Sequence, residues 1–169
     1  MVLSVAFSEA GEGWLMARKA ISENAPVMPY CILSILSNQS MASGASVPGV
    51  QWTNEISDQW GMHTMPSGTT IVVNRPGIWL VTFCVILNVT PVGASTWSGS
   101  LVKTGVGAFP AISASTLMSN VGFNYYAQST GLVACAANDA LSVTISQNSG
   151  ATGNVLTSSY FQAIYQGEV

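Results

Sequence analysis

The chain has 169 residues, which is long enough for one domain with a full core and too short to expect two. Only 7% of the residues are charged, against roughly 25% in an average soluble domain, and 49% are hydrophobic. A net charge of −3 does little to keep molecules apart, so we expect the protein to work within an assembly. The four basic residues are scattered along the sequence, which excludes a nucleic-acid groove. The longest apolar run, residues 77–87, is too short for a spanning helix, so no membrane partner is expected.

The sequence predicts an N-terminal arm at residues 1–25, followed by one domain at residues 26–169. Five of the eleven charged residues lie in this arm. A disordered terminus is the usual fate of such a segment, and its amphipathic stretch, residues 14–22, is too short to form a stable helix without a partner surface. Trp14, Leu15 and Met16 are a compact apolar cluster in polar surroundings, so we expect them to anchor the arm on another protein. The first seven residues lack the basic leader and cleavage site of a secretory signal.

Beyond the arm, the sequence predicts short strands separated by Gly, Pro, Ser and Asn turns, at the spacing of a sandwich or jelly roll. The expected strands are residues 30–37, 49–53, 69–73, 78–87, 97–103, 125–136, 140–147, 153–156 and 158–165. Arg75, Pro76 and Gly77 are typical of a tight turn, because proline presets φ and glycine accepts a positive φ. The fold class is therefore all-β and antiparallel, with no helix required in the domain.

The strand expected at residues 78–87 is apolar on both faces. One face carries Trp79, Val81, Phe83, Val85 and Leu87, and the other carries Ile78, Leu80, Cys84 and Ile86. A sheet with one solvated face would instead alternate apolar and polar residues, as residues 141–145 do. Both faces must leave water, and in an all-β chain of this size the commonest cover is another copy of the subunit.

Four segments carry motifs in a recognisable order. They are TTIVVNRPGIWLVTFCVILN at residues 69–88, SLVKTG at 100–105, GLVACAANDALSVTISQNSG at 131–150 and SYFQAIYQG at 159–167. This ordered set resembles the tumour necrosis factor-like and complement globular-head family. Two positions depart from the family pattern, since Asn138 and Ala163 stand where glycine is usual. The resemblance spans about residues 50–167 and implies a jelly roll of two antiparallel sheets that forms a homotrimer through its inner sheet.

The alternation of the terminal strand then predicts the trimer interface. Phe161, Ala163 and Tyr165 are expected to face the core. Strand parity leaves Tyr160, Gln162 and Ile164 for the threefold axis, where Ile78 and Leu80 of the doubly apolar strand join them.

The three cysteines, Cys31, Cys84 and Cys135, are odd in number and lie in separate apolar runs. We expect reduced, buried side chains, which suits assembly in a reducing cytoplasm.

The residue inventory disfavours catalysis. The chain has one histidine, His63, and two aspartates, Asp58 and Asp139, so the acid–base groups of an enzyme are nearly absent. Glu55, Asp58 and His63 are close in sequence, but a metal site needs more converging ligands, and a solvated loop is the expected structure. No catalytic, cofactor-binding or metal-binding residue is predicted, and no cofactor.

The family includes immune ligands, spore-surface proteins and phage virion proteins. The collagen stalk, signal peptide and disulfides of its secreted members are not seen in this sequence, whereas a short charged arm suits a protein that docks on a capsid or tail. The sequence therefore favours a structural virion protein of a bacteriophage. It would be a trimeric capsid decoration or cement protein, or a fibre- or tail-associated module, that binds other virion proteins. The alternative is a head domain of a phage or bacterial surface protein that binds a host receptor or glycan through residues 91–99 and 147–153.

Overall fold

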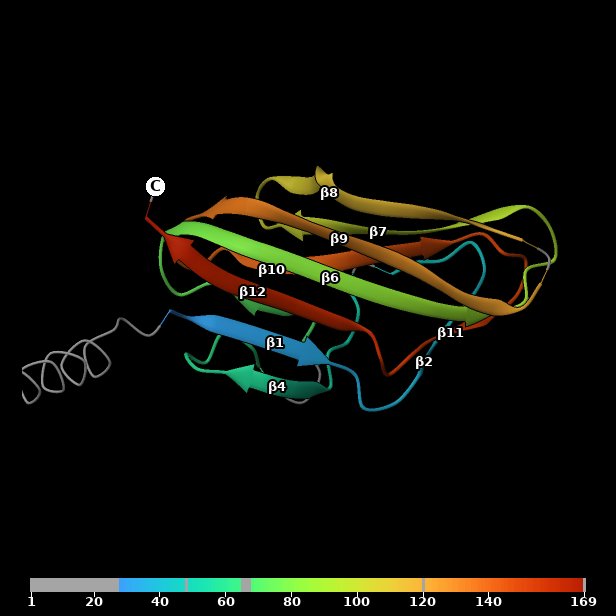
Figure 1. Cartoon of the computed structure of the whole chain (residues 1–169), viewed down its shortest axis with the longest axis horizontal. Coiled ribbons are helices and arrows are strands. Elements are labelled where there is room, and N and C mark those ends of the chain that lie inside the picture. Colours follow the sequence, from blue (N-terminus) through green and yellow to red (C-terminus); the bar gives the residue numbers. More distant parts are fainter. Residues whose placement is uncertain (1–27, 48, 65–67, 120, 169) are drawn as a thin grey trace, which may run out of the picture.

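The computed structural model describes residues 28–47, 49–64, 68–119 and 121–168, and this part of the chain is built from strands and turns. Two antiparallel sheets pack face to face (Figure 1). The strands are β1 (Tyr30–Ser34), β2 (Gln39–Met41), β3 (Ser46–Val47), β4 (Asn54–Asp58), β5 (Thr70–Val72), β6 (Gly77–Val89), β7 (Ser95–Lys103), β8 (Gly107–Met118), β9 (Phe123–Cys135), β10 (Ala140–Gln147), β11 (Gly153–Val155) and β12 (Tyr160–Gly167). Within these residues, no helix is long and apolar enough to cross a membrane.

The larger sheet has seven strands and the smaller has five. In the larger sheet the order is β2-β11-β6-β12-β1-β4, and β9 pairs with the other edge of β6. In the smaller sheet the order is β3-β10-β7-β8, with β5 also paired to β10. The described chain begins and ends at one end of the sandwich, whereas β6, β8 and β10 end at the opposite end, which we call the distal end (Figure 1).

The core lies between the sheets and is dominated by large aromatic side chains. Trp52, Trp79 and Trp97 are fully buried there. The Trp97 indole N–H donates a hydrogen bond of 3.2 Å to the Val85 carbonyl, which ties the two sheets together. As the strand alternation predicted, the inward face of β6 is fully buried. The predicted core residues of β12 are buried as well, namely Phe161, Ala163 and Tyr165.

Two turn positions have a positive φ, and for Gly77 the sequence predicted it. Gly77 has φ = 140°, in the turn after Pro76 that leads into β6. Asn138, where the resembling family usually has glycine, has φ = 71°. Asparagine tolerates this left-handed region better than most residues, so the turn between β9 and β10 forms without glycine.

The strand prediction differs from the structure at the sheet edges. Residues 49–53 form only an isolated bridge, between Trp52 and Gly68, and are not a strand. β2, β3, β4 and β8 were not predicted. All four lie at the end of a sheet order, where a strand need not show the strongly apolar pattern of a central strand.

Candidate functional site

The five predicted interface residues lie together on the outer face of the larger sheet, which is the face turned away from the core between the sheets. They are Tyr160, Gln162 and Ile164 on β12 and Ile78 and Leu80 on the neighbouring strand β6. All five side chains are partly buried in the single chain, whereas the alternate residues of both strands lie inside the core. The side assigned to each residue is therefore as predicted, and its contact with another subunit stays a prediction.

The strand register extends this face across β1 and β9. The first row contains Tyr30, Ile164, Leu80 and Leu132, the second Ile32, Gln162, Thr82 and Thr130, and the third Ser34, Tyr160, Cys84 and Gln128. We call these twelve residues the outer-face patch. It contains no Asp, Glu, Lys or Arg, and Leu132 is 65% exposed in the single chain. An uncharged surface with a large exposed leucine is typical of an interaction site.

The middle row is a polar band across the outer-face patch. The Thr130 hydroxyl donates a hydrogen bond of 3.1 Å to the Thr82 hydroxyl on the next strand. The side-chain amide of Gln162, which stands opposite Thr82, makes no hydrogen bond to the described residues. Its donor and acceptor therefore remain available for a group outside this chain.

Two side chains of the outer-face patch, those of Tyr160 and Cys84, have a raised pKa. Burial raises the pKa of the Tyr160 hydroxyl, and the nearby Cys84 raises it further. Burial also raises the pKa of the Cys84 thiol. At both groups the raised pKa favours the neutral form.

The three cysteines are free and buried, as predicted. Burial is the main cause of a raised pKa at Cys31, and it raises the pKa of Cys135 to about 11. Thiols in this state are poor nucleophiles.

Glu55, Asp58 and His63 do not form the solvated loop that was predicted. Glu55 and Asp58 lie on β4, and His63 is only 8% exposed. The backbone N–H of His63 donates to the Asp58 carboxylate at 2.8 Å, and its ring nitrogens lie 2.9 Å from the Thr70 carbonyl and 3.2 Å from the Trp52 carbonyl. His63 therefore links three backbone segments. The described part of the chain contains no group of three or more His, Cys, Asp or Glu side chains that could hold a metal ion.

The predicted recognition loops are shorter than expected. Since β7 begins at Ser95, Trp97, the aromatic residue assigned to the first loop, lies on this strand. Its side chain is fully buried in the core. What remains exposed at the distal end includes Val92, Val121 and Phe123. No charged residue occurs in residues 84–102 or among the described residues of 104–138.

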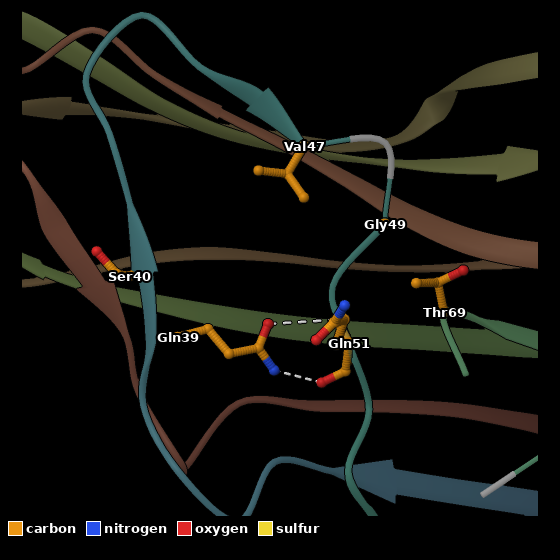
Figure 2. Close-up of a pocket in the computed structure, with 6 residues that line it drawn as sticks. All are labelled: Gln39, Ser40, Val47, Gly49, Gln51 and Thr69. Atoms are coloured by element: carbon orange, nitrogen blue, oxygen red, sulfur yellow. Dashed lines mark hydrogen bonds between the residues drawn. The ribbon is translucent and has the colours of Figure 1, made fainter. Parts of the chain in front are cut away.

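A groove of about 670 Å³ opens between β2 and residues 49–51 (Figure 2). Its lining is uncharged and consists of Gln39, Ser40, Val47, Gly49, Gln51 and Thr69. The amide of Gln39 reaches across it, donating to the Gln51 carbonyl and accepting a hydrogen bond of 3.2 Å from the Gln51 N–H. We call this site the Gln39 groove. Sequence reasoning missed it, because its residues match no motif and come from three separate segments.

The predicted arm boundary and the anchors Trp14, Leu15 and Met16 lie outside the described residues.

No family model matches this sequence, and no curated protein matches it significantly. Solved structures do match. Murine APRIL at pH 5.0 is 14% identical with a TM-score of 0.63, and the match covers 82% of this chain and 99% of that one. Eiger TNF from S. frugiperda is 11% identical with a TM-score of 0.61, covering 84% and 94% respectively. The globular domain of zebrafish complement 1qA is 11% identical with a TM-score of 0.58, covering 83% and 99%. Identities this low show the fold alone: the protein is a TNF-like jelly roll, like the globular domains of the TNF and C1q families.

Proposed function

We propose that this protein is a homotrimeric structural module of a bacteriophage virion, which its N-terminal arm docks on the particle. It decorates or cements a capsid, or belongs to a fibre or tail. The proposal assigns it no catalysis and no cofactor. The outer-face patch is the observation that carries the proposal, and the fold, the charge distribution and the position of the termini support it.

The outer-face patch supports self-association. Its first row is apolar apart from the Tyr30 hydroxyl, and the described residues leave Leu132 exposed. Burying such a face against another subunit contributes roughly 25 cal/mol for each Å² of apolar surface removed from water. A threefold axis repeats one contact three times, and residues at the axis meet their own copies in the other two subunits. The number three is taken from the TNF-like fold.

The distribution of charge supports an N-terminal arm that docks on the particle and a jelly roll that faces away from it. The arm holds five of the eleven charged residues of the chain. The described chain starts and ends at one end of the sandwich, opposite the distal end (Figure 1). An arm that leaves from the first end can bind a scaffold while the distal end points outward.

The trimer is tested by native mass spectrometry of the full chain, which should report three copies. A stable, soluble monomer at micromolar concentration would overturn the proposed assembly. The arm is tested by deleting residues 1–24 and measuring co-sedimentation with particles that lack this protein. We expect a folded trimer that no longer attaches. Attachment at undiminished occupancy would show that the jelly roll itself is the docking surface.

A second candidate is a head that recognises a host receptor or glycan. The observation in its favour is the distal end, where Val92 is 75% exposed and Phe123 is 59% exposed with no charged residue nearby in the sequence. Val92→Ser combined with Phe123→Ser should abolish adsorption of particles to host cells if this candidate is correct. The same changes would leave particle stability unaltered. Normal adsorption of particles that carry both changes would overturn this candidate and favour the structural role.

A further inference from the structure

The Gln39 groove has the geometry of a sheet position from which a strand is missing. β2 ends the strand order of the larger sheet and β3 ends that of the smaller, so the sandwich is open on this side. Residues 49–51 run opposite β2 across the groove, and the whole side chain of Gln39 lies between the two backbones (Figure 2). Paired strands stand only about 4.8 Å apart. The gap between the two backbones is as wide as a glutamine side chain plus a hydrogen bond. This width is enough for one extended segment.

The amide of Gln39 makes the bonds that such a strand would make. A primary amide offers one acceptor and two donors, much as a peptide group offers an acceptor and a donor. It engages both the N–H and the C=O of Gln51. The neighbouring N–H groups are used elsewhere, since Val50 donates to Val143 at 3.2 Å and Trp52 donates to Gly68 at 3.0 Å. The N–H and C=O of Gln51 therefore face the groove like those of an edge strand, and the Gln39 side chain occupies them.

We propose that residues 2–7 of the same chain, VLSVAF, add to this edge as a strand and displace the Gln39 amide. This segment has no charged side chain, as the groove has none. Valine and phenylalanine favour extended backbone. Its alternate residues also differ in size, with Leu3, Val5 and Phe7 on one side and Val2, Ser4 and Ala6 on the other. The groove offers matching walls, since Val47 is apolar and Gly49 lacks a side chain.

The connecting chain is long enough for this pairing. Twenty residues, 8–27, separate the segment from the first described residue. Extended, they reach up to about 66 Å at roughly 3.3 Å per residue. The longest strands of the sandwich have 13 residues and span about 43 Å on the same scale. A tethered segment also acts at an effective concentration in the mM range, so a few backbone hydrogen bonds suffice.

Hydrogen exchange at the Gln51 amide tests the proposal in the full chain carrying Gln39→Ala. Without the Gln39 cap, the amide stays slow only if residues 2–7 cover it. Adding Ser4→Pro with Val5→Pro removes a ladder donor in either register and should speed exchange by about tenfold or more. The matched control, Ala10→Pro with Gly11→Pro, changes the arm outside the segment and should leave exchange slow. Exchange in the Gln39→Ala chain at the rate of an open amide, with or without the prolines, would overturn the proposal.

A second measurement keeps Gln39 and so does not depend on that variant folding. A capped peptide of residues 1–8 is added to the full chain carrying Ser4→Pro and Val5→Pro. It should bind and slow exchange at Gln51, whereas the same peptide with both prolines should not. Equal effects of the two peptides, or none, would contradict the strand assignment. Neither result depends on the virion role, because the trimer and its attachment to particles are measured separately.

Discussion

Thr130 on β9 donates a hydrogen bond of 3.1 Å to the hydroxyl of Thr82 on β6, within the polar row of the outer-face patch. Thr82 is itself buried, although it points away from the core. The rows on either side contain Leu80, Ile164 and Tyr160, which are expected at the trimer axis. A hydroxyl pair in such a surface stabilises little by itself, but an unpaired hydroxyl left in a closed interface is costly. In the proposed trimer, this pair would leave each of the two hydroxyls with a partner.

The hydroxyl pair gives a prediction of strong non-additivity. Thr130→Val alone leaves the Thr82 hydroxyl without its donor in the assembled trimer, which should cost about 1–3 kcal/mol. Thr82→Val together with Thr130→Val removes both polar groups and should restore most of the loss. Urea unfolding of the trimer at fixed protein concentration measures both. Losses that simply add would mean that the pair stays hydrated and outside the interface.

Ile164 provides the direct test of the outer-face patch. Ile164→Asp places three carboxylates near the threefold axis, each losing hydration without a counter-ion, so the trimer should dissociate. Ser142→Asp is the matched control, because Ser142 alternates with the core residues of β10 and points outward from the other sheet. Native mass should report monomer for the first variant and trimer for the second. An intact Ile164→Asp trimer would show that the contact lies elsewhere.

The central strands could be predicted from the sequence, because two-sided burial leaves a strong pattern. Most inward positions of β6 and β12 carry large apolar residues, and these lie on the expected face. The edge strands leave no such pattern. β4 has the sequence NEISD and pairs only with β1, and β8 contains a proline, which an edge strand tolerates.

The Gln39 groove and the role of His63 depend on contacts between distant segments. Gln39 meets Gln51 across 12 positions, and His63 meets Trp52 across 11. Neither pair follows a local period, so alternation could not reveal it. The same is true of the Thr82–Thr130 pair, which the register of β6 with β9 brings together across 48 positions.

Gly99 lies where the inner faces of the two sheets approach closely, and its replacement tests the packing. A Cβ at this position would lie 2.9 Å from the Phe83 ring and 3.3 Å from the Ala127 methyl group. Gly99→Ala should therefore lower the free energy of unfolding by about 1–3 kcal/mol through overpacking. Gly93→Ala is the control, since a Cβ there meets nothing within 4 Å. Equal unfolding midpoints for both variants would mean that the sheets separate at little cost.

The environment of Asp139 predicts that the folded protein loses stability at low pH. Its carboxylate accepts a hydrogen bond of 2.9 Å from the Ala136 N–H and lies 3.0 Å from the Lys103 ammonium group. The backbone bond first, and then Lys103, lower the pKa of Asp139 in the folded protein. The unfolded chain therefore binds the proton more readily. The stabilisation is complete above the unfolded pKa of about 3.9 and is lost as the pH falls through the lower folded value.

Asp139→Asn isolates that contribution, because it removes the charge and keeps a hydrogen-bond acceptor. The variant should be less stable than the parent at pH 7, and the difference should shrink as the pH falls below about 4. Urea unfolding at a series of pH values measures it. Glu168→Gln is the control, since its ion pair with Arg75 is 3.8 Å long and its side chain is 85% exposed, so the acid limb should not change. A difference for Asp139→Asn that persists undiminished at low pH would assign the effect to the turn geometry, and not to the charge.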